Sequence, residues 1–137
     1  MNRSLILCAQ GSLDARGRAA LAGLVNAVRR EAPTLDVLDA YVDVQHPSIN
    51  EAVSGTGGPR AIVPLMLTWD RPVRVDIVRA FQLDPLAVIS PPLGPDWVLA
   101  EVGVRRLFEA GARATDTIVL AADVTTDDRA VSDIGEA

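Results

Sequence analysis

Hydrophobic residues along the chain come in short unbroken runs separated by longer amphipathic segments. The first run, Leu5 to Ala9, stops at the polar turn signal Gln10-Gly11-Ser12. A short apolar run bounded in this way is typical of a strand that is covered on both faces, as in a parallel sheet. In such sheets, functional groups gather where a strand ends and the next helix begins. Gln10, Gly11 and Ser12 are therefore the first candidate functional residues.

The segments between the runs carry apolar residues at helical spacing. Leu21, Leu24, Val25 and Val28, for example, recur at i, i+3, i+4 and i+7 and predict one apolar face of a helix. Expected strands cover 5–9, 37–44, 61–67, 86–90 and 117–122, and expected helices cover 14–32, 49–54, 72–82 and 97–110. This alternation predicts an α/β domain in three layers, with a mainly parallel sheet of four to five strands flanked by helices.

Residues at the expected helix starts support these assignments. Ser12 or Asp14 can cap the helix after the first strand, and Ser48 with Glu51 forms a capping box for the short second helix. Pro64 is unusual inside an expected strand, because proline lacks the N–H that a sheet ladder uses. We therefore expect an irregularity near the end of that strand.

The last apolar run resembles the first one. Residues 118–129 align with residues 5–16 at a constant offset of 113, so that Asp127 matches Asp14. The pattern predicts a domain over 1–113 followed, over 114–137, by an extra strand and tail that resemble the start of a truncated second copy. Alternatively, any two buried strands followed by capped helices look alike. A lone extra strand would have to pair at the edge of its own sheet or on a partner chain.

The composition argues against two classes of binding partner, nucleic acids and membranes. The 137 residues carry a net charge of −5, which disfavours nucleic acid as a partner because phosphate binding needs clustered basic residues. No apolar run approaches the ~20 residues of a membrane helix, and the run after Arg3 is too short for a signal peptide. We therefore expect a cytoplasmic protein without a membrane partner. Cys8, the one cysteine, is expected to be a small core residue.

Several short sequence segments occur along the chain in an order that resembles a known protein family. These are Gln10-Gly11-Ser12, YVDVQHPSI at 41–49, IVPLML at 62–67, PVRVDI at 72–77 and SPPLGP at 90–95. Over about residues 4 to 112, the series is similar to the sirohydrochlorin chelatase family, the small class II tetrapyrrole chelatases that insert cobalt or iron without a partner ATPase. The resemblance implies a parallel-sheet domain used as a homodimer or as two fused copies, with the macrocycle received in a cleft between the domains.

The chain departs from the family pattern at two important positions. In the family, one histidine ends the first strand in His-Gly-Ser, and a second follows the Pro-Leu-x-Leu strand in a Gly-x-His loop. Here Gln10 stands at the first position, while Asp70 and Pro72 match the glycine and the second histidine. Imidazole can hold a metal ion and accept a pyrrole proton near neutral pH, whereas an amide does neither well. The resemblance therefore predicts a member that has lost metal insertion, with no metal site and no cofactor.

Other polar residues near the expected strand ends have two interpretations each. The only histidine, His46, could be a relocated metal ligand or an exposed loop residue. Asp43 and Asp76 could act as acid–base groups or serve in pairing and capping. Ser12 could contact a ligand or act only as a helix cap.

The residues around the third loop also have two interpretations each. Met66 and Trp69 could pack on a flat macrocycle or belong to the core. Arg71, together with Arg74 and Arg79, could meet the carboxylates of an acidic tetrapyrrole or stay solvated. The candidate substrate-binding residues are Gln10, Gly11, Ser12, His46, Met66, Trp69, Asp70, Arg71 and Pro72.

Three hypotheses about function follow from these residues. The first is a degenerate chelatase-like protein that binds a tetrapyrrole or pairs with a related domain. The second is an active chelatase with a rearranged site that uses His46 and an acidic residue such as Asp70. The third is a small α/β interaction module without a small ligand.

Overall fold

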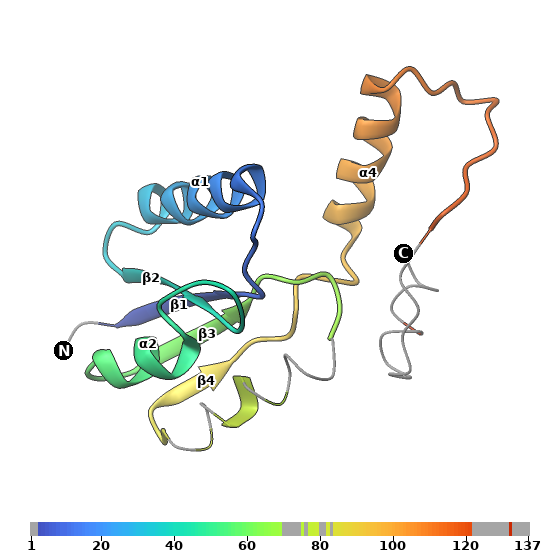
Figure 1. The fold of residues 1–137 in the computed structure, drawn as a ribbon. Helices are drawn as coiled ribbons and strands as arrows, with labels where there is room; N and C mark the ends of the chain where they lie inside the picture. The colour runs from blue at the N-terminus through green and yellow to red at the C-terminus, as the bar shows by residue number, and fades with distance from the viewer. Residues whose placement is uncertain are drawn as a thin grey trace.

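The computed structural model describes residues 3–69, 75, 77–79, 82, 84–121 and 132, and the structural statements below concern these residues. Four parallel strands form one sheet in the order β2-β1-β3-β4 (Figure 1). The elements are β1 (Ser4–Ala9), α1 (Ala15–Glu31), β2 (Asp36–Tyr41), α2 (Ile49–Gly55), β3 (Arg60–Pro64), β4 (Ala87–Ile89) and α4 (Trp97–Glu109). The predicted α/β class, with a parallel sheet flanked by helices, is confirmed.

Side chains that alternate along the strands build one core on each face of the sheet. Leu7 of β1 packs with Val25 of α1 on one face, which we call the α1 face. Ile6 and Ile62 pack with Ile49 of α2 on the opposite face, which we call the α2 face. The sheet therefore lies between helices on both sides, as the three-layer prediction requires.

The helix starts agree with the caps expected from the sequence. Asp14 caps α1 and accepts a hydrogen bond from Gly17 N at 2.9 Å. The capping box of Ser48 and Glu51 is present at α2. Asp96 caps α4 and accepts from Val98 N at 2.8 Å. Each cap satisfies backbone donors that the first turn of a helix leaves unpaired.

Several strands are shorter than the apolar runs that predicted them. β2 ends at Tyr41, although its run reaches Val44, and Val44 itself has φ +48°, outside the extended region. β3 ends at Pro64, the residue at which we expected an irregularity in this strand. Of the helix expected at 72–82, residues 75, 77–79 and 82 are helical, and the rest lie outside the described residues.

The fifth strand expected at 117–122 is wrong over residues 117–121, the part that the structure describes. Ile118, Val119 and Leu120 are 54%, 84% and 69% exposed, and they join no strand of the described sheet. An apolar run predicts burial, but a strand also needs a neighbouring backbone to bond with. The proposed boundary at 113 and the internal repeat remain predictions.

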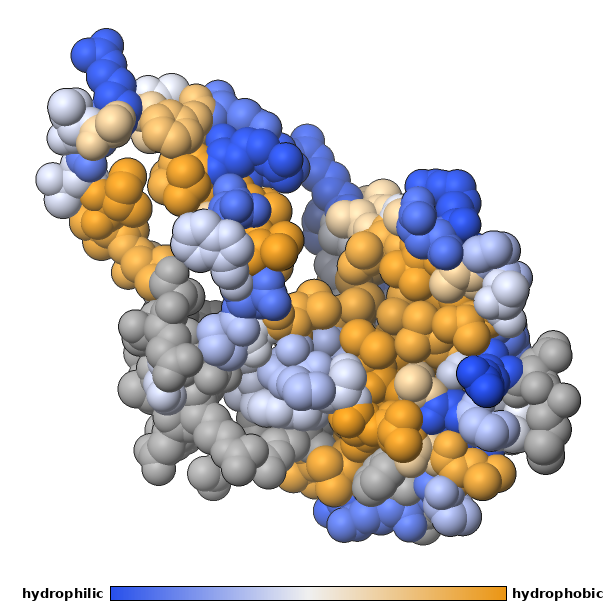
Figure 2. All heavy atoms as spheres, turned by 180° about the vertical axis from the view of Figure 1, so that it is seen from behind, coloured by the Kyte–Doolittle hydropathy of each residue, from blue (hydrophilic) through white to orange (hydrophobic). Residues whose placement is uncertain are grey.

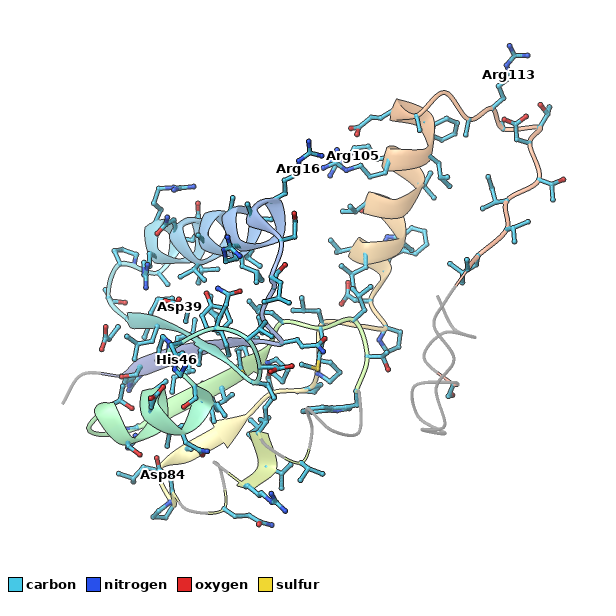
Figure 3. The ribbon with its side chains drawn as sticks, in the orientation of Figure 1. Arg16, Asp39, His46, Asp84, Arg105 and Arg113 are labelled. Carbon is cyan, nitrogen blue, oxygen red and sulfur yellow. The ribbon has the colours of Figure 1, made fainter. Side chains whose placement is uncertain are left out.

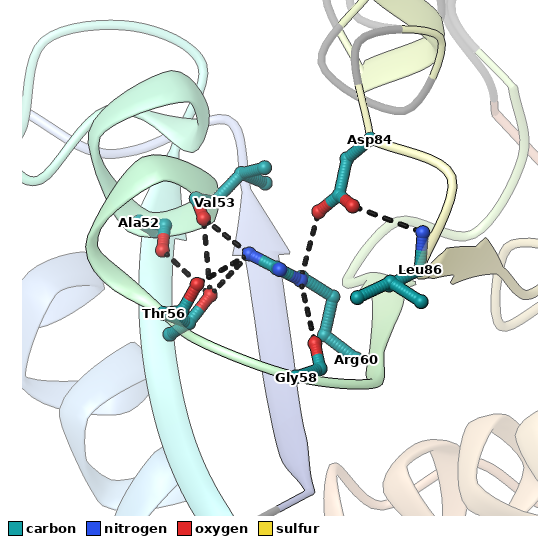
Figure 4. A network of polar contacts seen from close by, with 7 residues as sticks. All are labelled: Ala52, Val53, Thr56, Gly58, Arg60, Asp84 and Leu86. Carbon is teal, nitrogen blue, oxygen red and sulfur yellow. Dashed lines mark hydrogen bonds and ion pairs between the residues drawn. The ribbon is translucent and has the colours of Figure 1, made fainter.

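The buried side chain of Arg60, at the start of β3, ties the end of α2 to the sheet (Figure 4). Its Nη1 donates to the carbonyl oxygens of Val53 and Thr56 and to the Thr56 hydroxyl. Its Nε donates to Gly58 O at 3.2 Å. Charge-assisted bonds of this kind hold the loop between α2 and β3 in one conformation.

Candidate site at the carboxyl edge of the sheet

The loops that follow the four strands meet at one edge of the sheet, which we call the carboxyl edge. Asp43 N donates to Gln10 O at 2.9 Å, which joins the loops after β1 and β2. Leu93 N donates to Met66 O at 2.8 Å and joins the loops after β3 and β4. Parallel topology thus brings the loops that carry Gln10, His46 and Met66 to one edge of the sheet.

Gly11 and Ser12 lie against the loop after β2. Gly11 has φ +100°, and a Cβ built on it would lie 2.3 Å from Asp43 O, so only glycine fits here. Ser12 N donates to the side-chain oxygen of Gln45 at 2.7 Å. The sequence analysis missed Gln45, although its place among the polar residues just before His46 marked it as a loop residue beside the site.

Gln10 occupies the position where the family pattern has its first histidine. The residue is exposed, and its side-chain amide has no hydrogen bond to another residue of the described part. Its backbone carbonyl, by contrast, is held by Asp43 N. The position is therefore fixed by the backbone while the amide remains accessible from solvent.

His46 lies beside α2 and takes part in the start of that helix (Figure 3). Its Nδ1 is 3.2 Å from Oε2 of Glu51, and the imidazole is 84% exposed. The same Oε2 accepts from Ser48 N at 2.6 Å. The Ser48 backbone N–H, followed by the His46 side chain, lowers the pKa of Glu51 from 4.5 to about 2. His46 thus pairs with a helix-capping carboxylate.

Met66 and Trp69 are half-buried and pack against the core on the α2 face. That contact fits the interpretation of both residues as core, while their partial exposure leaves part of each side chain accessible. Arg79 is exposed. The other predicted residues after β3 lie outside the described residues, namely Asp70, Arg71, Pro72, Arg74 and Asp76.

Exposed apolar side chains at the carboxyl edge were missed by the sequence analysis. Each of the four loops contributes one: Leu13 after β1, Val44 after β2, Leu67 after β3 and Leu93 after β4. Their exposed fractions are 79%, 47%, 64% and 40% in that order. Exposed apolar side chains mark a binding site where they form one patch, which makes these four side chains candidates for contact with a ligand. Isolated leucines in loops are common, so these residues are only a weak signal in the amino-acid pattern.

The described residues do not supply a set of metal ligands. No group of three or more His, Cys, Asp or Glu side chains within them could hold an ion. Cys8 is buried in β1, and burial raises the pKa of its thiol to about 12, so the thiolate that binds metals does not form near neutral pH. Within the same residues, no helix is long and apolar enough to span a bilayer.

A small parallel α/β domain whose strand-end loops meet at one edge belongs to a class of fold that binds ligands at that edge. The model of the CbiX family matches residues 4–110, and the chain belongs to this family. The search of curated proteins found no match.

Two solved structures show the same fold. One is a CbiX protein from Marinobacter aquaeolei VT8 that is assigned to cobalamin (vitamin B12) biosynthesis; the identity is 22%, the TM-score is 0.60, and the match covers 80% of this chain and 94% of that one. The other is SirB from Bacillus subtilis with Fe3+, with 20% identity and a TM-score of 0.67. The match covers 82% of this chain but 49% of SirB, so this chain spans about half the length of SirB.

Proposed function

We propose that this chain is a tetrapyrrole-binding member of the CbiX family that does not itself insert a metal ion. The absence of an imidazole at Gln10 carries the proposal, because metal insertion needs a group that holds the ion and accepts the displaced pyrrole protons. A neutral amide accepts no proton at cellular pH. The proposal includes a cytoplasmic location.

Binding of a macrocycle is supported by the exposed apolar side chains at the carboxyl edge. A tetrapyrrole is flat and largely apolar on its faces, and Leu13, Val44, Leu67 and Leu93 offer it apolar surface from all four loops. Sirohydrochlorin, the substrate of the family's chelatases, is the macrocycle that we expect. Burial of these side chains against the ring would supply most of the affinity.

An absorbance titration with metal-free sirohydrochlorin tests the binding. We expect a saturable spectral change with the wild-type chain and a several-fold weaker affinity for Leu67→Ser. Leu86→Ser is the matched control, because Leu86 is 50% exposed but precedes β4, at the opposite edge of the sheet. No spectral change at high micromolar protein, or equal losses in both variants, would count against binding at the carboxyl edge.

A metal-insertion assay with Co²⁺ or Fe²⁺ under anaerobic conditions tests whether the chain lacks this activity. The wild-type chain should not exceed the spontaneous rate, whereas Gln10→His combined with Pro72→His should restore a measurable rate. Arg30→His places an imidazole in the last turn of α1, which leads into the first residues of β2 at the opposite edge of the sheet, and should restore nothing. Insertion by the wild-type chain would overturn the proposal, and loss of that insertion in His46→Ala would then identify a rearranged active site.

A further inference from the structure

Tyr41 is buried at the carboxyl end of β2, and its hydroxyl belongs to a chain of polar contacts. Alternation along the strand places Asp39 and Tyr41 on the α1 face, the same face as Val37. The Tyr41 hydroxyl donates to Oδ2 of Asp39 at 3.0 Å. Oδ1 of Asp39 lies 3.3 Å from Nη2 of Arg29, and Nε of Arg29 donates to Val37 O at 3.0 Å. The Asp39 carboxylate is thus held from two sides, by α1 and by Tyr41.

Gln45 continues this chain of contacts to the loop after β1. Tyr41 N donates to Pro47 O at 2.9 Å, so the loop after β2 folds back on the end of its own strand. Burial, followed by the Asp39 carboxylate, raises the pKa of Tyr41, whereas a hydrogen bond from the Gln45 side chain opposes that rise. Oε1 of Gln45 accepts from Ser12 N at 2.7 Å. The contacts therefore link α1, β2 and the loops after β1 and β2.

The carboxylate of Asp39 sets the direction of each hydrogen bond in the chain. A carboxylate only accepts hydrogen bonds, so the Tyr41 hydroxyl gives its one hydrogen to Asp39. The hydroxyl oxygen is then left as an acceptor, and Gln45 turns its NH₂ group toward it. The amide oxygen of Gln45 consequently faces Ser12 N. A reversed amide would bring two donors together at Ser12, which makes the observed direction the favourable one.

We propose that Tyr41 is a positioning residue for the candidate site, which acts through Gln45 on the loop after β1. Two hydrogen bonds hold this loop, one on each side of Gly11: the bond to Gln10 O and the bond from Ser12 N. Of the two, only the bond from Ser12 N ends on a side chain, and Tyr41 orients that side chain. Loss of the Tyr41 hydroxyl should therefore loosen the loop while the strands of the sheet stay paired.

The placement of this loop matters because it carries the exposed amide of Gln10. Hydrophobic side chains cover a broad area of the body of the protein (Figure 2), and the loops at the carboxyl edge add exposed apolar side chains. In ligand sites of this kind, a few placed polar groups fix the orientation of the ligand. The Gln10 amide can donate a hydrogen bond to a carboxylate of a tetrapyrrole. This last step rests on the proposed function, whereas the ordering of the loop does not.

Amide hydrogen exchange measured by NMR tests the positioning without any ligand. The internal reference is Leu65 N, which donates to Cys8 O at 2.7 Å and reports on the pairing of β1 with the chain after β3. The ratio of the Ser12 exchange rate to the Leu65 rate should rise several-fold in Tyr41→Phe, because the Gln45 amide is then free to turn.

The carboxylate of Asp39 should have the same effect from further away. Asp39→Ala frees the Tyr41 hydroxyl to donate elsewhere, so the ratio of the Ser12 rate to the Leu65 rate should also rise, although Asp39 does not contact the loop after β1. Asp36→Ala is the matched control, because it removes the same charge from the same strand at a residue that makes no ion pair with the described residues. It should leave the ratio unchanged.

Absorbance titration with metal-free sirohydrochlorin measures the effect on the site. The Kd should rise several-fold in Tyr41→Phe and stay unchanged in Asp36→Ala. In a Gln10→Ala background, Tyr41→Phe should weaken binding no further, because the positioned group is already gone. Additive losses would mean that Tyr41 does not act through Gln10.

The exchange rates decide the proposal even where the titration fails. A wild-type chain without a spectral change would remove the proposed function, and the Ser12 rate would still show whether Tyr41 orders the loop. An unchanged Ser12 rate in Tyr41→Phe would overturn the positioning. So would Ser12 and Leu65 rates that rise by the same factor, because Tyr41 would then support only the fold.

Discussion

Arg60 and Asp84 form an ion pair that joins the start of β3 to the residues before β4. Nε of Arg60 lies 2.8 Å from Oδ2 of Asp84, and the two side chains are 7% and 12% exposed. Nε carries a single hydrogen, which it donates to Gly58 O, and Oδ2 accepts no hydrogen bond from the described residues. The two groups therefore attract each other through charge, at a place where water screens that charge little.

Loss of one charge of this pair should destabilise the fold. Asp84→Asn keeps an oxygen that can accept from Leu86 N but leaves Arg60 without its counter-charge. We expect the free energy of unfolding to fall by about 3 kcal/mol, as for other broken buried pairs. Urea unfolding followed by circular dichroism measures the change.

The exposed pair of Arg106 and Glu109 provides the control for this prediction. Its side chains are 75% and 52% exposed, so Glu109→Gln should change the free energy of unfolding by less than ~1 kcal/mol. An equal or larger loss in Glu109→Gln than in Asp84→Asn would mean that the Arg60–Asp84 pair adds nothing by its burial.

Gly11→Ala should destabilise the carboxyl edge. The added Cβ would meet Asp43 O, and alanine disfavours the φ of +100° that this residue adopts. We expect a loss of at least ~1 kcal/mol, measured by urea unfolding. Gly23→Ala in α1 is the matched control, because a Cβ there meets nothing within 4 Å and should stabilise the helix by up to ~1 kcal/mol. Opposite signs for the two variants are expected, and a shared sign would contradict the close approach at Gly11.

The fold was predictable from the sequence because its signals are local. The apolar runs at 5–9 and 61–67 and the caps at Asp14 and Ser48 each act within a few residues; the runs contain β1 and most of β3, and both caps are present. The apolar run from Ile118 to Leu120 led to a wrong strand prediction, because strand formation also depends on a distant backbone partner.

The candidate site was less predictable, since its contacts join residues far apart in the chain. The bond from Ser12 N to Gln45 spans 33 positions, and nothing in the local pattern of either residue indicates it. Likewise, Gly94 reads as a loop glycine, whereas its close approach to Leu67 O is visible only in the structure. Composition and periodicity do not encode such pairings.

Glu51 should make stability depend on pH in the acid range. Its pKa is about 2 in the folded chain, below the ordinary value of 4.5, so the folded state binds fewer protons between these values. The contribution of Glu51 to the free energy of unfolding is therefore complete above pH 4.5 and is lost as the pH falls through about 2. Urea midpoints near neutral pH and near pH ~3 should differ less in Glu51→Gln than in the wild-type chain.

A second exposed carboxylate is the control for this pH dependence. Glu101→Gln on α4 should leave the difference between the two midpoints as it is in the wild-type chain, because Glu101 makes no ion pair with the described residues. A Glu51→Gln protein with an unchanged pH dependence would show that Ser48 and His46 do not hold the carboxylate in solution.

Cys8 should react with thiol reagents only when the sheet opens. Its side chain is fully buried on β1, and burial raises the pKa of the thiol to about 12, so both access and ionisation oppose the reaction. The rate with a disulfide reagent should be low in buffer and rise with urea, in step with unfolding of the central strand. Ser54→Cys adds an exposed thiol on α2 and should react at once, which calibrates the reagent. Fast modification of Cys8 in buffer would mean that β1 opens without global unfolding, and the core on the α2 face would then be less stable than its packing indicates.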